Sequence, residues 1–240
     1  MILNMVIPLF LFTALTAADK PIAMVSYLLG EAHLQKQNQW EKISLNTKIL
    51  SGDKVRTSES SAIEIKYLNS PLVVRLGEKS EAVISPLQGQ DTKNQLLAGK
   101  IWVNLKKIGQ SPDQFSVASP LAVAAIRGTI FRMNFDSSQT TAVLCYDGKV
   151  DVGPEQRLKD KIEQNKKPSA WGFNTEGGPG EVSGPREVSL EEWVQIVKGM
   201  QINVKSNGEF QTFQFDQKKD AQEEWVSFNE QRDAIQPVEK

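Results

Sequence analysis

Residues 115–135 read FSVASPLAVAAIRGTIFRMNF, and this stretch decides the fold. Two apolar runs flank a Ser119-Pro120 corner and an Arg127-Gly128-Thr129 step. An apolar residue at every second position is typical of a strand with one buried face. Pro120 lacks a backbone N–H and suits a corner or an edge, while Gly128 lets the chain bend or pack closely. The stretch therefore predicts strands joined by tight corners.

The same alternation recurs through residues 25–152. The run Phe131–Phe135 inside that stretch carries it, and so do Ile63–Tyr67 and Ile101–Leu105. Asp147-Gly148 is a two-residue hairpin signal before Val150 and Val152. Many short strands with no helix between them are typical of a sandwich, barrel or solenoid. Because no strict repeat period is present, a solenoid has to be irregular. The fold class we expect is mainly β, an irregular β-solenoid or sandwich-like domain over residues 25–152.

The first 18 residues differ from the rest of the chain. They carry no charged side chain, hold an apolar stretch from Met5 to Leu15, and end in Thr16-Ala17-Ala18. This pattern predicts a secretory signal peptide at residues 1–18, and hence a periplasmic or secreted protein with no stable membrane span after cleavage. Cys145, the only cysteine, is expected to be a buried, inert strand residue.

The chain changes character after residue 152. Residues 153–186 are rich in lysine, glycine and proline and read as a linker. Residues 187–240 read as a small helix-hairpin-helix region. Its first helix would start at a capping box of Ser189 and Glu192 and place Trp193, Val194 and Val197 on one face. Asn207-Gly208 predicts the hairpin, and a last helix is expected from about Asp220 to Ile235. The apolar faces of this tail would pack on the β domain, on one another, or against a partner.

Several motifs occur in an order that resembles the FecR domain. They are Gly30-Glu-Ala, Trp40, Gly52-Asp-Lys-Val-Arg-Thr57, Ala62-Ile-Glu-Ile65, Leu97-Ala-Gly-Lys-Ile-Trp-Val103, Ser119-Pro120 through Phe131, and Tyr146-Asp-Gly-Lys-Val150. The resemblance covers about residues 25–152. The resemblance implies that this region is similar to the periplasmic domain of bacterial iron-siderophore signalling regulators. That domain also occurs alone in exported proteins.

The remainder of the chain departs from a full regulator of that family. We expect no cytoplasmic sigma-factor-binding segment ahead of the signal-like segment, and the tail does not resemble the family's terminal lobe. The spacing Trp225, Asn229 and Arg232 looks like the Trp-x-x-x-Asn-x-x-Arg ending of some stand-alone exported relatives. The resemblance therefore favours a stand-alone exported FecR-domain protein over an anti-sigma regulator.

Residues that could carry catalysis are sparse. His33 is the only histidine, and no cysteine cluster, P-loop or dinucleotide-binding glycine pattern is present, so we expect no metal, no cofactor and no enzyme activity. Paired carboxylates remain the one route to glycan hydrolysis, through Asp53, Glu64, Glu78, Glu81 or Asp136. A net charge of −1 (28 Lys and Arg against 29 Asp and Glu) argues against nucleic-acid binding.

Two groups of residues are candidates for binding or for structural motifs. The first is Arg127, Gly128, Thr129 and Phe131, where we favour an arginine that ties neighbouring turns over one that binds an acidic ligand. The second is Trp225, Asn229 and Arg232, where helix packing outranks ligand binding. Trp40 and Trp102 are interpreted as core residues in preference to a carbohydrate platform.

The function that these observations favour is an exported, non-catalytic binding or regulatory module of the cell envelope. Its partner would be an envelope protein or polysaccharide lying along exposed strand edges. One alternative is an envelope assembly factor that oligomerises through residues 187–240. A carboxylate-based glycan hydrolase is the other.

Overall fold

The computed structural model describes residues 20–87, 93–105, 115–156, 160 and 193–235. The signal peptide expected at residues 1–18, the capping box at Ser189 and Glu192, and most of the linker expected at residues 153–186 lie outside the described residues. The strands and helices of the described part are β1 (Ala23–Leu29), β2 (Ala32–Lys36), β3 (Gln39–Lys42), β4 (Lys48–Ile49), β5 (Asp53–Thr57), β6 (Ala62–Tyr67), β7 (Leu72–Leu76), β8 (Glu81–Ile84), β9 (Lys93–Leu105), β10 (Phe115–Ala118), β11 (Ala122–Ile126), β12 (Ile130–Phe135), β13 (Thr140–Asp147), β14 (Lys149–Pro154), β15 (Val194–Val197), β16 (Met200–Lys205), β17 (Phe210–Gln214), α2 (Gln217–Asp220) and α3 (Glu224–Ile235).

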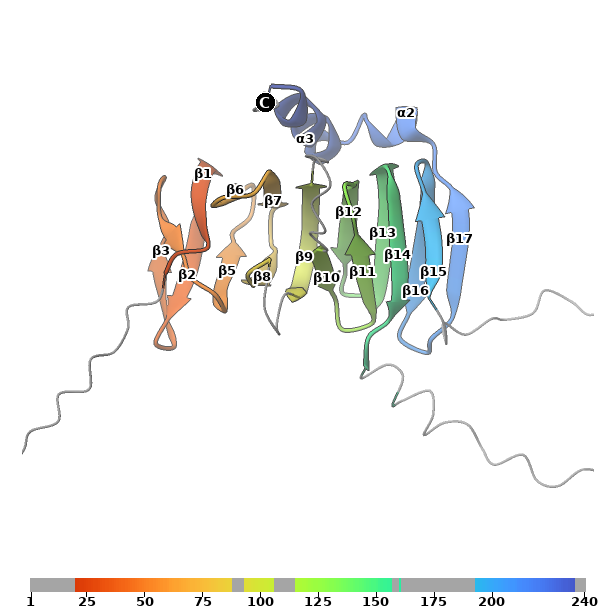
Figure 1. Cartoon of the computed structure of the whole chain (residues 1–240), viewed down its shortest axis with the longest axis horizontal. Coiled ribbons are helices and arrows are strands. Elements are labelled where there is room, and N and C mark those ends of the chain that lie inside the picture. The colour runs from red at the N-terminus through yellow and green to blue at the C-terminus, as the bar shows by residue number, and fades with distance from the viewer. Residues whose placement is uncertain (1–19, 88–92, 106–114, 157–159, 161–192, 236–240) are drawn as a thin grey trace, which may run out of the picture.

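The strands form two rows, which we call sheet A and sheet B. Sheet A runs β4-β1-β6-β7-β9-β12-β13-β16-β17. Sheet B runs β3-β2-β5-β8-β9-β10-β11-β14-β15. The long strand β9 belongs to both, pairing through its first half in sheet B and through its second half in sheet A. Figure 1 shows the strands following one another along the long axis in nearly chain order. The expected mainly β, solenoid- or sandwich-like fold is confirmed.

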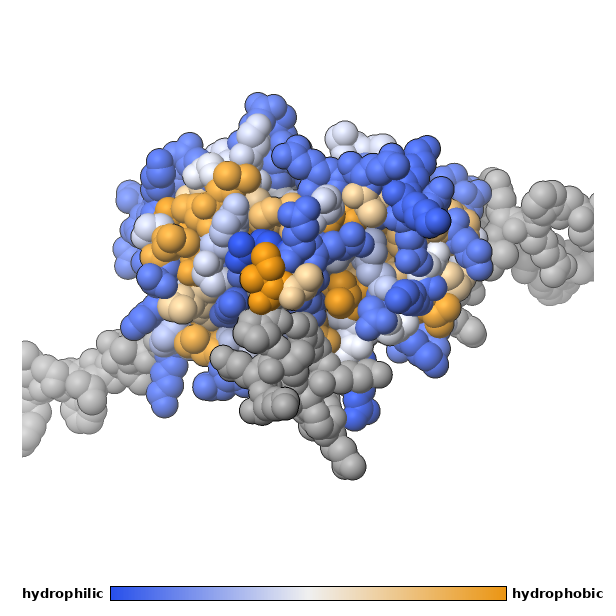
Figure 2. Space-filling view, turned by 90° about the horizontal axis from the view of Figure 1, so that it is seen from above, coloured by the Kyte–Doolittle hydropathy of each residue, from blue (hydrophilic) through white to orange (hydrophobic). Residues whose placement is uncertain are grey.

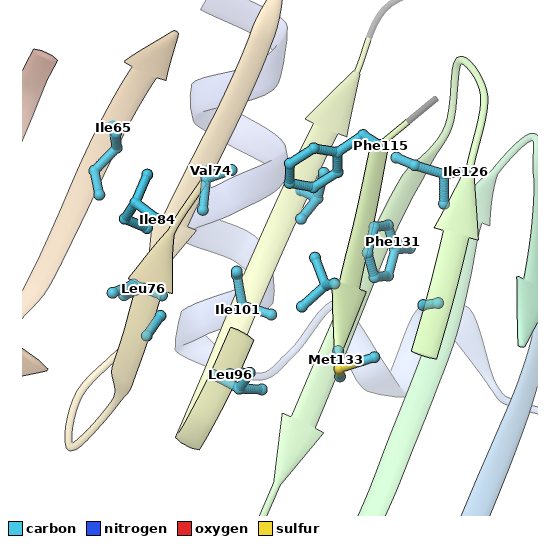
Figure 3. Packing of buried hydrophobic residues seen from close by; sticks show 14 of the residues in the cluster. Ile65, Val74, Leu76, Ile84, Leu96, Ile101, Phe115, Ile126, Phe131 and Met133 are labelled. Carbon is cyan, nitrogen blue, oxygen red and sulfur yellow. The ribbon is translucent and has the colours of Figure 1, made fainter. Parts of the chain in front are cut away.

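The core lies between the two sheets and is built by the alternation seen in the sequence. Ile63 and Ile65 on β6, Ile101 on β9 and Phe131 on β12 point inward and are almost fully buried. Figure 3 shows Ile65, Ile101 and Phe131 in the same cluster as residues of the other sheet, such as Ile84, Phe115 and Ile126. Each strand thus contributes one face to a shared core, and its other face is left for a second layer or for water.

The Ser119-Pro120 corner forms as the residues suggest. Strands β10 and β11 are antiparallel neighbours in sheet B, and the Ser119 hydroxyl accepts hydrogen bonds from the backbone N–H groups of Leu121 and Ala122. The next step, residues 127–129, carries the chain from β11 in sheet B to β12 in sheet A. Gly128 has φ +63° there, a left-handed conformation that glycine adopts at little cost.

Two expectations about secondary structure are wrong. Residues 194–197 form strand β15 and not a helix, because Ile196 is buried while Gln195 and Val197 are exposed, and the segment pairs with β14. The β-branched side chains of this segment are compatible with a helix and with a strand, and pairing with a neighbouring strand decides between the two. Asp147-Gly148 makes a tight turn but not a hairpin, since β13 pairs with β12 and β16 while β14 pairs with β11 and β15.

The tail after residue 200 extends the β domain. Strands β16 and β17 form the expected hairpin across Asn207-Gly208 and continue sheet A. The expected last helix is α3, which with α2 lies on one side of the strand array in Figure 1. Of the readings left open for the tail, packing onto the β domain is the one seen. Within the described residues, no helix has the length and apolar character to cross a membrane.

Candidate functional site

A row of polar and aromatic residues crosses the outer surface of sheet A. Tyr27, Glu64, Arg75, Trp102 and Arg132 are successive cross-strand neighbours on β1, β6, β7, β9 and β12. They occupy the outward positions between the inward core residues of the same strands. Together with Tyr146 on β13, they make up what we call the ionic face.

Glu64 is the centre of the ionic face. Its carboxylate accepts hydrogen bonds from Ser26 Oγ at 2.7 Å, from Arg75 Nε at 2.7 Å and from Arg232 Nε at 2.8 Å. Burial would raise the pKa of Glu64, but the hydrogen bonds from Arg232, Ser26 and Arg75 outweigh it and lower the pKa to about 2. The side chain is therefore a permanent anion near neutral pH and is unsuited to donate a proton.

Arg75 links the sheet to the C-terminal helix. Its side chain is fully buried and its Nη1 donates to Asp233 Oδ1 at 2.6 Å and to Asn229 Oδ1 at 3.3 Å. The other oxygen of Asp233 accepts a hydrogen bond from Trp102 Nε1 at 2.9 Å. One helical carboxylate thus joins β7 and β9.

A second cluster lies where α2 leads into α3. Arg132 donates to Asp220 at 2.6 Å and to Glu223 at 2.9 Å, and the hydroxyl of Tyr146 donates to Asp220. Burial, with a further contribution from the Asp220 carboxylate, raises the pKa of Tyr146 although the charge of Arg132 opposes it. The phenol therefore stays protonated and serves as a donor. The Tyr146 ring also contacts Trp102 in a tilted arrangement, with ring centroids 4.4 Å apart.

The structure places the predicted trio Trp225, Asn229 and Arg232 at this helix–sheet contact. Asn229 is fully buried and donates to the carbonyl of Trp225 at 2.6 Å. The Arg232 guanidinium lies 4.2 Å from the centre of the Tyr27 ring while it binds Glu64. Helix packing accounts for all three, and Asn229 lies inside the contact. Figure 2 shows that this side of the molecule carries hydrophilic residues interleaved with smaller hydrophobic areas.

The other predicted group forms a corner of the fold. Phe131 is fully buried in the core, and Thr129 Oγ1 donates to the carbonyl of Lys149 at 2.9 Å. Arg127 is exposed, and within the described residues no hydrogen bond or ion pair gives its side chain the expected tie to neighbouring turns. Nor does any such interaction join this group to the Trp225, Asn229 and Arg232 group in that part of the chain. The two predicted groups are therefore separate.

Sequence reasoning missed most of the contacts between the ionic face and the C-terminal helices. Arg75, Arg132, Asp220 and Asp233 were not singled out, because charged residues at outward strand positions and on a polar helix look solvent-exposed. Trp102 is buried as expected, but under α3 and not in the inter-sheet core. The sequence did hold one signal of a covered outer surface. It was a large aromatic residue at an outward strand position, with charged residues at the same level of the neighbouring strands.

The remaining candidates for chemistry have structural partners. Asp53 accepts a hydrogen bond from the Leu50 N–H, Glu78 from the Ser60 N–H, Glu81 pairs with Lys54, and Asp136 binds Ser138. His33 is half-buried on β2, 3.9 Å from Glu31. Within the described ranges, no three His, Cys, Asp or Glu residues gather as metal ligands would. Cys145 is buried, as expected.

The two ends of the sheet pair differ in charge. At one end, edge strand β3 carries Glu41 and Lys42, which form ion pairs with Lys36 and Glu31. At the other, edge strands β15 (VQIV) and β17 (FQTFQ) hold no charged residue. Val197 and Phe213 on these strands are 40% and 41% exposed. We call β15 and β17 the uncharged end. Edge strands that lack charge, proline or a bulge are open to pairing with another strand.

Part of the chain matches a known protein family. Residues 53–151 match the sequence model of the family described as FecR protein. The structure is similar to two crystal structures, at 1.65 and 2.50 Å resolution, of a protein from Parabacteroides distasonis ATCC 8503 described as an anti-sigma factor. The identity is 16% and the TM-score 0.46, and the match covers 70% of this chain but only 62% of that one. No curated protein matches the sequence significantly.

Proposed function

Since residues 53–151 of this chain are a FecR domain, we propose that the protein is an exported, non-catalytic binding module of the bacterial cell envelope. Its partner is an envelope protein, bound by strand addition at the uncharged end. Export is supported by the uncharged, apolar segment of residues 1–18, which has small residues at its end.

The observation that carries this proposal is the contrast between the two ends of the sheets. A partner strand added to β17 or β15 would gain backbone hydrogen bonds without bringing a charge out of water. The charged side chains of β3 make the same addition unfavourable at the other end. A protein supplies such a strand, whereas a polysaccharide has no regular row of amide donors and acceptors.

Self-assembly is the second candidate, and the same end favours it. An uncharged strand can pair with its own copy about a two-fold axis without placing like charges opposite one another. Because β15 and β17 end the two sheets on the same side, one axis could extend both sheets at once.

The test is photo-crosslinking in the native envelope. A photoreactive phenylalanine analogue replaces Phe213 on β17 or Val197 on β15, and replaces Trp40 on β3 as the control. We expect one envelope protein to be captured from both positions at the uncharged end and not from position 40. Thr212→Lys should abolish capture, whereas Gln39→Lys at the other end should not.

Each other outcome has a meaning. Capture of the protein's own chain alone would replace the proposal by self-assembly. Equal capture from position 40, or capture that survives Thr212→Lys, would show that the uncharged end is not the binding surface.

A further inference from the structure

We propose that the ionic face is a helix-docking surface that α3 occupies in cis, and that a partner helix with the same charge pattern can take its place. This surface lies on the outer side of sheet A and is distinct from the uncharged end. The occupant is defined by its chemistry: a helix with an acidic residue followed, nine and ten positions later, by arginine and aspartate.

The sheet's half of the contact is formed without the helix. Glu64 and Arg75 are directly opposite one another on β6 and β7 and pair at 2.7 Å, and Ser26 adds a further hydrogen bond to Glu64. Strand pairing also fixes Trp102 and Arg132 in the same row. Departure of α3 would therefore return Glu64 and Arg75 to water as an ordered ion pair, and not as isolated buried charges.

Much of the contact between helix and sheet is polar. Among the residues of α3, only Val226 and Asn229 are buried, and Ile235 is 77% exposed. Beside the ring contact of Phe228 with Tyr27, whose centroids are 5.4 Å apart, Arg232 binds Glu64 and Asp233 binds Arg75 and Trp102. An interface with little apolar burial and several ion pairs is weaker than a core contact and sensitive to salt.

The spacing of the charges matches that of the strands. Glu223 binds Arg132 on β12, and Arg232 binds Glu64 on β6. Glu223 immediately precedes α3, and the nine helical residues from Glu224 to Arg232 rise about 14 Å. From β12 across β9 and β7 to β6 are three strand spacings, also about 14 Å. A helix lying across the strands with this spacing meets both ends of the row, which is a specific requirement on any competitor.

The experiment uses the full chain and a labelled peptide. The probe is a fluorescein-labelled peptide of residues 216–235, titrated by fluorescence anisotropy with wild-type protein and with the double variant Arg232→Ala and Asp233→Ala. The variant weakens the cis helix and leaves the ionic face intact. We expect the peptide to bind the variant at least about tenfold more tightly than wild type, since the cis competitor is removed.

The matched control is the same peptide carrying the two alanines, which should bind neither protein. Hydrogen exchange shows whether α3 has lost protection in the variant. Should the double variant fail to fold, Asp233→Asn keeps the side chain's shape and weakens the contacts with Arg75 and Trp102, so that it serves the same purpose.

Two results would overturn the inference. One is a folded variant with unprotected α3 that binds no peptide. The other is a wild-type α3 whose amides exchange only with those of the core strands, which would make α3 a permanent part of the fold. Both results are independent of the crosslinking experiment at the uncharged end, because Arg232 and Asp233 lie on neither β15 nor β17.

Discussion

At the scale of the residue, Glu64 shows how hydrogen bonds and ion pairs offset the cost of burying a charged side chain. It is fully buried, yet two arginines and a serine hydroxyl satisfy its oxygens. Removing one partner of such a group is costly because the other charges remain in a site without solvent. The carboxylate that the sequence offered as a catalytic candidate is thus a structural anion that joins sheet and helix.

Glu64→Gln should destabilise the protein by roughly 3–5 kcal/mol, because Arg75 and Arg232 lose their counter-charge. The effect is also pH-dependent. The pKa of Glu64 falls from 4.5 to about 2 on folding, so its contribution is complete above pH 4.5 and is lost as the pH falls toward 2. Urea unfolding between pH 7 and pH 3 measures both.

The difference between wild type and Glu64→Gln should therefore shrink with decreasing pH. Glu59→Gln is the control, because the Glu59–Lys79 pair is exposed. A difference that stays constant from pH 7 to pH 3 would contradict the role assigned to the Glu64 anion.

At the scale of the element, β9 determines how the two sheets are joined. It crosses from sheet B to sheet A at Gly99, whose φ is +82°. A Cβ atom at Gly99 would lie 2.3 Å from Ser80 Oγ and 2.6 Å from Ser80 Cα. The crossing therefore also requires a residue without a side chain. The turn at Gly52 has a similar φ of +84°, but a Cβ atom added there would have no heavy atom within 4 Å.

Replacing each glycine by alanine separates the two effects. Gly52→Ala should cost about 1–2 kcal/mol for the left-handed backbone alone. Gly99→Ala should cost roughly 1–3 kcal/mol more, because the added methyl overlaps Ser80. Chemical denaturation of both variants gives the comparison. Equal losses of stability would show that β9 relieves the overlap by a small shift.

At the scale of the whole molecule, the fold is a pair of sheets with one continuous core. Cys145 on β13 is a natural reporter of that core, because it is the only cysteine and is buried. Burial, assisted by the nearby Asp147 carboxylate, raises the pKa of its thiol to about 12. Both conditions keep the thiol unreactive in the folded protein.

Cys145 should therefore react with a thiol reagent at pH 8 only when the molecule opens. We expect no labelling of native protein over hours and complete labelling in urea, with a rate that follows the unfolded fraction. Ser138→Cys, which adds an exposed thiol in the β12–β13 turn, should label one further equivalent at once. Rapid labelling of native wild type would mean that sheet A opens locally around β13.

The sequence by itself determined the strands, their inward faces and most corners. Alternation in Ile63–Tyr67, the Ser119-Pro120 corner and the Asn207-Gly208 hairpin are local effects of side-chain period and backbone preference, so a short window contains them. The ordered FecR motifs extended that prediction to the domain.

Only the tertiary structure decided which outward residues are buried and which strands pair. Glu64 and Arg232 are 168 positions apart, and residues 194–197 become a strand because β14 is beside them. Burial of a charge depends on such distant partners, and a local pattern holds no information about them. For this reason the core could be predicted and the ionic face could not.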